Sequence, residues 1–125
     1  MMLDARDMRI AARVRRPGYA HRYPYQFTLR SALPSGAPTE LGKIIEGKGD
    51  WLFYGHASDA EPGLGSWWLI DLRAFRAGLI RSRRSGSSIN CGSKLNPDGT
   101  SFMWFDVRSF PKEPPLVVAS GSKSG

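Results

Sequence analysis

Two apolar stretches of the sequence place the strongest constraint on its fold. Asp50–Ala57 and Trp67–Ile70 carry apolar side chains at both odd and even positions. Because successive residues of a β-strand point to opposite faces, such strands normally lie inside a sheet that is covered on both sides. The segment between them, Ser58–Ser66, contains one proline and two glycines, which is typical of a connecting loop. We therefore expect both strands inside a covered β-sheet.

The first half of the chain predicts two more strands and a short helix. Met8–Arg15 alternates apolar residues with arginines, which is the pattern of a half-buried strand. Tyr25–Arg30 is rich in residues that favour strands. Thr39 is a suitable N-cap for a short helix over Glu40–Glu46.

The second half predicts a longer helix and two further strands. Asp71 is a suitable N-cap for an amphipathic helix with arginines on its outer face. Arg83–Ser93 is rich in Arg, Gly and Ser and is expected to be a mobile loop. Asn96–Gly99 is a strong turn signal before a strand over Thr100–Val107. A last short strand is expected at Leu116–Ala119.

These elements together predict an α/β (α+β) fold. We expect a mixed sheet of about five to six strands with two short helices laid against it. The length of 125 residues leaves room for one core of normal size, and 41% hydrophobic with 23% charged residues is typical of a globular chain. We therefore expect a single domain over residues 1–120 and a flexible tail over residues 121–125.

The net charge of +7 is unevenly distributed along the chain. Residues 1–30 carry seven arginines and two aspartates, whereas residues 31–71 hold six acidic and two basic residues. Residues 72–94 add five arginines and one lysine, with no acidic residue. Two basic segments therefore flank an acidic one.

Arginine dominates both basic segments, and its planar guanidinium group suits bidentate contact with phosphate. We expect the two segments to meet in space as one cationic surface that binds nucleic acid or a host nucleoprotein complex. A solvated surface of arginines without a partner is the alternative explanation of the same composition. The candidate nucleic-acid-binding residues are Arg13, Arg15, Arg16, Arg30, Arg73, Arg76, Arg81, Arg83 and Arg84.

Aromatic residues offer a second route to nucleic acid, through stacking on bases. Most of them, Trp104 included, lie in expected strands, where packing in the core explains them better. The exception is the expected loop Tyr19–Tyr25, whose rings alternate with basic residues. Such a segment suits a nucleic-acid contact and a protein–protein hot spot equally well.

Residues that could hold a metal ion or act as a nucleophile form no motif. Cys91, His21 and His56 are too scattered to predict a zinc site or a thiol enzyme. His56 is expected to fill a strand position with one ring nitrogen hydrogen-bonded. We expect no catalytic residue, no metal site and no cofactor. The carboxylates that could in principle hold Mg²⁺ are Asp4, Asp7, Glu40, Asp50, Asp71 and Asp106.

The sequence also carries expectations about location. No apolar run reaches the length of a membrane span, so we expect no membrane partner. The single Cys91 cannot form an internal disulfide, and the first residues lack the apolar stretch of a secretion signal. These features favour the cytoplasm. The oligomeric state stays open, a homodimer through the aromatic strands included.

A succession of short phrases adds a family resemblance that covers most of the chain, from about Ile10 to Ala119. The chain resembles small proteins of bacteriophages and other mobile elements that we associate with the PD-(D/E)xK nuclease-like fold. The phrases that carry the resemblance are Arg13–Tyr19, Phe27–Arg30, Ser35–Ile44, Gly49–Ala57, Trp68–Arg76, Asp98–Phe102 and Phe105–Asp106.

The resemblance implies a nuclease-like core, shortened at its N-terminus, in which carboxylates and a lysine on neighbouring strands hold Mg²⁺. On the matching strand Met8–Arg15, Ala11 stands where a carboxylate is expected and Arg13 stands where the lysine is expected. Arginine keeps its proton near neutral pH, so Arg13 could clamp phosphate but not act as a base. The resemblance therefore implies a scaffold that binds without cutting.

Three functional hypotheses follow. The first is a small phage-type protein that binds nucleic acid or a nucleoprotein complex through its arginines. The second is an anti-CRISPR-like inhibitor of a host defence machine that acts by protein–protein contact. The third is an active Mg²⁺-dependent nuclease that uses Glu40, Asp50 or Asp71.

Overall fold

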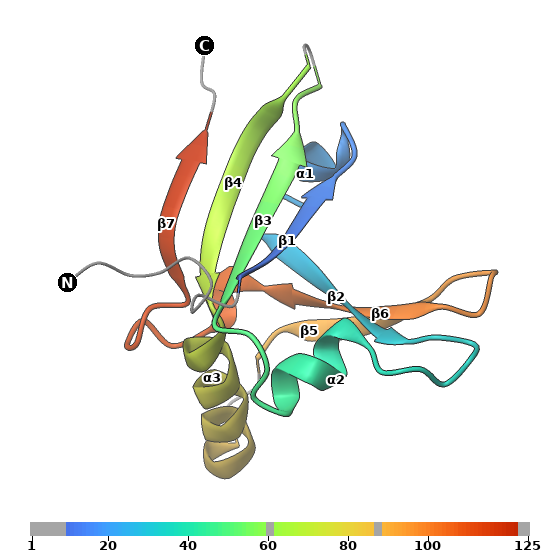
Figure 1. Cartoon of the computed structure of the whole chain (residues 1–125). Coiled ribbons are helices and arrows are strands. Elements are labelled where there is room, and N and C mark those ends of the chain that lie inside the picture. Colours follow the sequence, from blue (N-terminus) through green and yellow to red (C-terminus); the bar gives the residue numbers. More distant parts are fainter. Residues whose placement is uncertain (1–9, 60–61, 87–88, 123–125) are drawn as a thin grey trace.

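A computed structural model of the chain describes residues 10–59, 62–86 and 89–122. Within these residues, seven strands form two separate sheets, accompanied by three α-helices and one short 3-10 helix. Figure 1 shows the strands of the smaller sheet running across those of the larger one.

The larger sheet, sheet A, has four strands in the order β1-β3-β4-β7. β1 runs parallel to β3, whereas the β3–β4 and β4–β7 pairs are antiparallel, so the sheet is mixed. Its strands are β1 (Ile10–Arg15), β3 (Trp51–Ala57), β4 (Leu64–Asp71) and β7 (Val117–Ser122).

The smaller sheet, sheet B, has three antiparallel strands in the order β2-β6-β5. They are β2 (Gln26–Ala32), β5 (Cys91–Leu95) and β6 (Ser101–Asp106). β5 and β6 form a hairpin across the predicted turn, in which the backbone N–H of Asn96 donates to the carbonyl of Thr100 at 2.8 Å.

The helices begin at the residues that the sequence favours as caps. The Thr39 hydroxyl accepts from the Gly42 N–H at 3.2 Å at the start of α2 (Glu40–Ile45). The Asp71 carboxylate accepts from the N–H groups of Arg73 and Ala74, at 2.9 and 3.3 Å, at the start of α3 (Leu72–Ser85). The remaining short helices are α1 (Tyr19–Arg22) and η2 (Val107–Ser109).

The core lies between the inner face of sheet A, sheet B and α3. Phe27 of β2 sits at its centre, with its ring centroid 5.8 Å from that of Phe75 on α3 and 5.3 Å from that of Phe105 on β6. On its opposite face β2 buries Thr28, whose hydroxyl is 3.3 Å from that of Tyr54 on β3. The core residues are Phe27, Leu29, Leu41, Ile44, Leu52, Tyr54, Ile70, Leu72, Phe75, Phe105, Phe110 and Leu116.

The predicted fold class is confirmed, and the details differ in four places. The described residues form three α-helices instead of two short ones, since α1 lies in the expected loop Tyr19–Tyr25 and α3 has 14 residues. The strands form two sheets rather than one, with seven strands instead of five or six. Both ends of the expected loop Arg83–Ser93 are regular, since α3 runs to Ser85 and β5 starts at Cys91. The loop prediction failed there because cross-strand pairing, which a local pattern does not show, holds β5 in the sheet. β7 extends to Ser122, so residues 121 and 122 are not a tail, and residues 123–125 lie outside the described part.

The two faces of sheet A are covered unequally. On the inner face, Leu52, Tyr54 and Ile70 are fully buried, as expected. On the outer face, the described residues leave Ile10 51% and Val14 56% exposed, and the side chains of β3 on this face are only half-buried. The expectation of cover on both sides therefore holds for one face only within the described residues.

The N-cap of α3 generates a test of this fold. We expect Asp71→Ala to lower the free energy of unfolding by about 1 kcal/mol, because two backbone N–H groups of the first helical turn lose their acceptor. Urea unfolding followed by circular dichroism measures the change. Asp71→Asn, which keeps an acceptor oxygen, is the control. If both variants lose the same free energy of unfolding, the N-cap hydrogen bonds are not the source of the loss.

Candidate nucleic-acid interface

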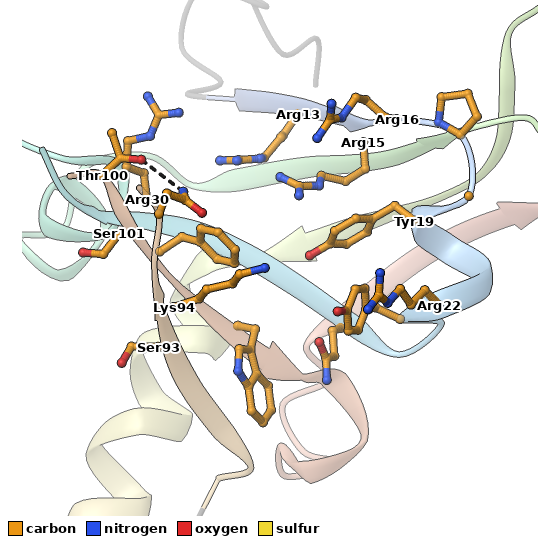
Figure 2. A pocket seen from close by; sticks show the side chains of 17 residues that line it. Arg13, Arg15, Arg16, Tyr19, Arg22, Arg30, Ser93, Lys94, Thr100 and Ser101 are labelled. Atoms are coloured by element: carbon orange, nitrogen blue, oxygen red, sulfur yellow. Dashed lines mark hydrogen bonds between the residues drawn. The ribbon is translucent and has the colours of Figure 1, made fainter. Parts of the chain in front are cut away.

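A groove of about 940 Å³ opens between the β1–α1 segment and one face of sheet B, and we call it the cationic groove (Figure 2). Six of its lining residues are cationic, and none of the described residues that line it is acidic. It is lined by Arg13, Arg15, Arg16, Pro17, Gly18, Tyr19, Arg22, Tyr23, Gln26, Arg30, Ser93, Lys94, Asn96, Thr100, Ser101, Phe102 and Trp104.

The first wall comes from β1 and the turn that follows it. Strand alternation places Arg13 and Arg15 on the same face of β1, which is the inner face of sheet A. Gly18 then adopts a φ of 88°, a left-handed conformation that favours glycine, and the chain turns into α1. The Gly18 N–H donates to the carboxylate of Asp59 in the β3–β4 loop, which holds this turn in place.

The second wall is one face of sheet B. Arg30 of β2 and Lys94 of β5 are both registered with Phe102 of the central strand β6, one on each side. Paired residues of neighbouring strands point to the same face, so the three side chains form a row across the sheet. Arg30 and Lys94 are exposed, and Phe102 is half-buried.

Trp104 forms the next row, on the same face of β6. Its register partners are the buried Thr28 of β2 and Gly92 of β5. A Cβ added at Gly92 would lie 2.8 Å from Cε2, Cζ2 and Nε1 of the Trp104 indole. The indole therefore occupies the space above Gly92, where a larger residue would exclude it.

Nearby groups hold some of the cationic side chains in position. Arg13 donates to the carboxylate of Glu40 at 3.0 Å, and the same oxygen accepts from the Arg30 backbone N–H at 3.1 Å. The guanidinium carbon of Arg15 lies 4.0 Å from the centre of the Tyr19 ring, a cation–π contact. Arg13 is therefore largely neutralised by its ion pair, whereas the exposed Arg16 remains available to a ligand.

The nine predicted binding residues divide between two places. Arg13, Arg15, Arg16 and Arg30 line the cationic groove, but none of the five arginines of α3 does. Arg76 donates to the backbone carbonyls of Ile44 and Gly49, at 3.2 and 3.3 Å, and so fixes the end of α2. Of the second basic segment, Lys94 lines the groove, whereas the expectation that the α3 arginines join the same surface is wrong. The α3 arginines outside it are Arg73, Arg76, Arg81, Arg83 and Arg84.

The physical reason is the direction of α3. Its apolar side, with Leu72 and Phe75, packs into the core, and its basic side therefore points away from the groove between the sheets. Arg73 stays near its own cap, 3.7 Å from Asp71, and Arg81 reaches the Glu113 carbonyl at 3.5 Å. Arg83 and Arg84 are exposed in the last turn.

The sequence reasoning missed four residues of the groove. Arg22 lies in the expected loop Tyr19–Tyr25, and Lys94 follows the stretch that was expected to be a mobile loop. Trp104 was predicted to pack in the core and Phe102 was given no role, yet both line the groove. The alternation of Phe102 and Trp104 along β6, opposite the buried Phe105 side, is the signal that could have found them.

The candidate carboxylates do not converge into a metal site. No group of three or more His, Cys, Asp or Glu residues that could hold a metal ion occurs in the part of the chain that the structure describes. Glu40 is paired with Arg13, and Asp71 caps α3. Asp4 and Asp7 lie outside the described residues. The convergence that the nuclease hypothesis requires is therefore lacking among the described carboxylates.

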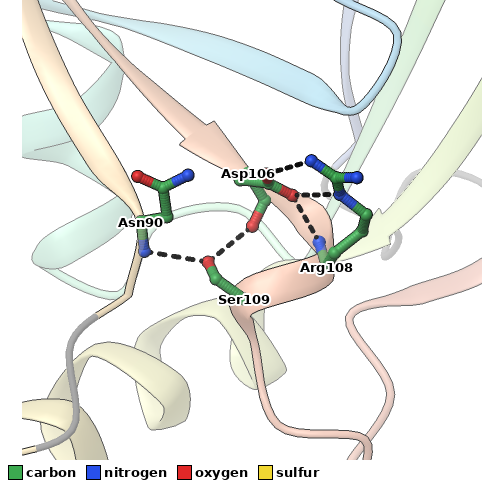
Figure 3. Close-up of polar contacts among 4 residues, drawn as sticks. All are labelled: Asn90, Asp106, Arg108 and Ser109. Atoms are coloured by element: carbon green, nitrogen blue, oxygen red, sulfur yellow. Dashed lines mark hydrogen bonds and ion pairs between the residues drawn. The ribbon is translucent and has the colours of Figure 1, made fainter.

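Asp106 instead has a structural role (Figure 3). Its carboxylate accepts from the backbone N–H of Arg108 at 2.8 Å and pairs with the Arg108 guanidinium group at 2.8 Å. These contacts hold the pKa of the Asp106 carboxyl below its usual range, chiefly through the Arg108 side chain. Ser109 donates to the Asp106 carbonyl and accepts from the Asn90 N–H, which ties η2 to the start of β5.

His56 is buried on the inner face of sheet A, close to the groove wall. It is 2% exposed, and its ring lies among those of Tyr19, Tyr54 and Trp68. Neither ring nitrogen has a hydrogen-bond partner among the described residues, so the prediction of one bonded nitrogen is wrong. Burial lowers the pKa of His56, and the positive charge of Arg15 lowers it further.

Comparison of the chain with protein-family models, with curated proteins and with solved structures finds no match. Among the described residues, no helix combines the length and the apolar character that crossing a lipid bilayer requires. The resemblance to phage proteins of the nuclease-like fold stays a prediction.

The buried imidazole generates a pH-dependent prediction. The lowered pKa of His56 keeps it neutral in the folded state, while the unfolded chain takes up a proton near the ordinary value of about 6.5. The free energy of unfolding should therefore fall as the pH drops below about 6.5, and stop falling once the folded-state pKa is passed. Urea unfolding across this range measures the slope.

A pair of variants isolates the contribution of this one histidine. His56→Phe keeps a ring of similar shape and should remove most of the slope without loss of stability near neutral pH, since no polar atom remains buried there. His21→Gln, which removes the other histidine from an exposed position of α1, is the control variant. If His56→Phe keeps the native slope, the buried His56 is not the cause of the pH-dependent stability.

Proposed function

We propose that this protein binds nucleic acid through the cationic groove, with its arginines and Lys94 in contact with the phosphate backbone. The observation that carries the proposal is the convergence of six cationic side chains from β1, α1, β2, β5 and the β1–α1 turn on one groove. Confining like charges in this way is unfavourable for the folded chain alone, and a polyanion relieves it. We propose no catalytic step for the groove.

The kind of cation supports a phosphate ligand. Five of the six are arginines, whose guanidinium groups offer several donors in a plane and pair with phosphate oxygens in bidentate fashion. Three of them, Arg16, Arg22 and Arg30, are exposed and can reach a ligand without breaking the core. Hydroxyl and amide groups of Gln26, Asn96 and Ser101 add neutral hydrogen-bonding partners along the groove.

An acidic protein surface is the competing ligand, as an anti-CRISPR-like inhibitor would require. Tyr, Trp and Arg are the residues most enriched in protein–protein hot spots, and the groove holds all three. The two ligands differ in one measurable respect. A protein partner that stays bound at equal stoichiometry after nuclease treatment, combined with no affinity for oligonucleotides, would favour the inhibitor.

Salt dependence tests the proposal. We expect the affinity for a fluorescein-labelled oligonucleotide to fall steeply as salt rises, with a log–log slope of up to about −3.5 for a single strand and about −4.5 for a duplex if the five cations other than the ion-paired Arg13 contact phosphate. Fluorescence anisotropy at increasing NaCl concentration gives the slope. Affinity that stays flat across the salt range would overturn the proposal.

A matched pair of double variants locates the contact. Arg16→Ala with Arg30→Ala removes two exposed charges of the groove and should reduce the magnitude of the slope by about 1.5. Arg83→Ala with Arg84→Ala removes two exposed charges from the end of α3 and should leave slope and affinity near those of the unaltered protein. Equal losses in both variants would show that total charge, and not the groove, governs binding.

A further inference from the structure

The proposed phosphate contacts give no role to two aromatic side chains of the groove. Phe102 and Trp104 line it from β6, and neither belongs to the core cluster or to the partly buried residues packed against that cluster. Core packing, which explains Phe105 on the opposite face of the same strand, therefore does not explain these two rings. Two half-buried rings in a cationic groove need another reason to be there.

The Trp104 ring turns one face toward β5 at Gly92, where an added Cβ would lie above the ring plane near the Nε1–Cζ2 edge. A Cβ at Gly92 would be 2.8 Å from three successively bonded atoms of the indole. No point in the plane of the ring is 2.8 Å from all three of these atoms. The Cβ position therefore lies above that plane. One face of the indole is thus turned to Gly92 and β5, which leaves the other face directed away from β5.

Phe102 has a different neighbourhood on the same sheet face. It lies between Arg30 and Lys94 in the cross-strand register, with a cation on each side. A base stacked on this ring would have its flanking phosphates within reach of both cations. The row combines a stacking surface with charge neutralisation at the same place.

The two walls of the groove therefore differ in chemistry. The wall from β1 and α1 presents Arg15, Arg16 and Arg22, while the wall from sheet B presents the two rings with Arg30 and Lys94 beside them. A ring can stack on a base only if the face of that base is free. In a duplex the faces are already stacked on neighbouring base pairs, whereas in a single strand they are accessible.

We propose that the cationic groove takes single-stranded nucleic acid, with bases stacked on Phe102 and Trp104 and the backbone directed to the arginines of β1 and α1. This inference rests on the proposed function and names its substrate class. Stacking on rings is tolerant of sequence, because every base has a flat face. The groove accordingly selects strandedness more than sequence.

Four labelled probes of about 15 nucleotides, near the upper site size of comparable single-strand grooves, test the inference on the full chain. They are oligodeoxythymidylate, oligouridylate, a DNA duplex, and an abasic strand that keeps the phosphates but lacks the bases. We expect both base-bearing single strands to bind more tightly than the abasic strand and the duplex. Comparison of the two single strands shows whether the groove prefers DNA or RNA.

Variants of the rings should act on bases only. Phe102→Ala and Trp104→Ala should each weaken binding of the base-bearing single strands by roughly 5- to 150-fold, the range that one stacked base contributes. Binding of the abasic strand should stay unchanged. Arg16→Ala with Arg30→Ala, by contrast, should weaken binding of all four probes.

Gly92→Ala tests the position of the indole without removing any ring or charge. Gly92 does not adopt a positive φ, so its backbone accepts alanine, but the added methyl group meets the Trp104 ring. We expect tilting of the ring to weaken binding of the base-bearing strands and not of the abasic strand. On the unaltered chain, ultraviolet crosslinking to a 5-bromouracil oligonucleotide should mark the peptide that contains Phe102 and Trp104.

The outcomes separate the two proposals. If the abasic strand and the duplex bind as tightly as the base-bearing strands, or if the crosslink falls elsewhere, the single-strand inference is overturned while the groove remains a phosphate-binding site. If no probe binds even at low salt, both proposals fall together.

Discussion

The structure depends on the burial of β2 on both of its faces. Phe27 and Leu29 point into the aromatic core beneath α3, and Thr28 points to the opposite side, where its hydroxyl meets that of Tyr54; all three are fully buried. This one strand therefore joins sheet B to sheet A and to the helix at once. The two sheets cross at this contact (Figure 1). The cationic groove lies beside it, between the β1–α1 segment and sheet B.

The groove brings like charges together, and the scaffold offsets their repulsion in separate ways. Glu40 neutralises Arg13, the Tyr19 ring lies beneath Arg15, and the Asp59 carboxylate fixes the turn at Gly18. Lys94 and Arg30 are separated by the width of a strand, with Phe102 between them. The walls are thus formed without a ligand, and the proposed binding of nucleic acid would meet a preorganised groove.

Much of the fold was predictable, and less of the site. Asp71 and Thr39 cap their helices as expected, and the Asn96–Gly99 turn joins two strands, since caps and turns depend on residues close in sequence. Four of the nine predicted arginines line the groove. The α3 arginines were predicted there from composition, which does not show that Arg76 is used to hold α2. Trp104 was predicted to lie in the core because it falls in an expected strand, and only the packing partners of each strand face show which rings belong to the core.

The sequence by itself determined the local elements: alternation in the strands, the caps of α2 and α3, the glycine turn at Gly18 and a strong excess of arginine. These are set by steric preferences and hydrogen bonds within a few residues. The tertiary structure alone decided that the strands form two crossing sheets, and therefore that β1 arginines face Lys94 and Trp104 across a groove. The reason is that strand pairing and sheet packing join residues far apart in the chain, and their free energy comes from burial that no local pattern contains.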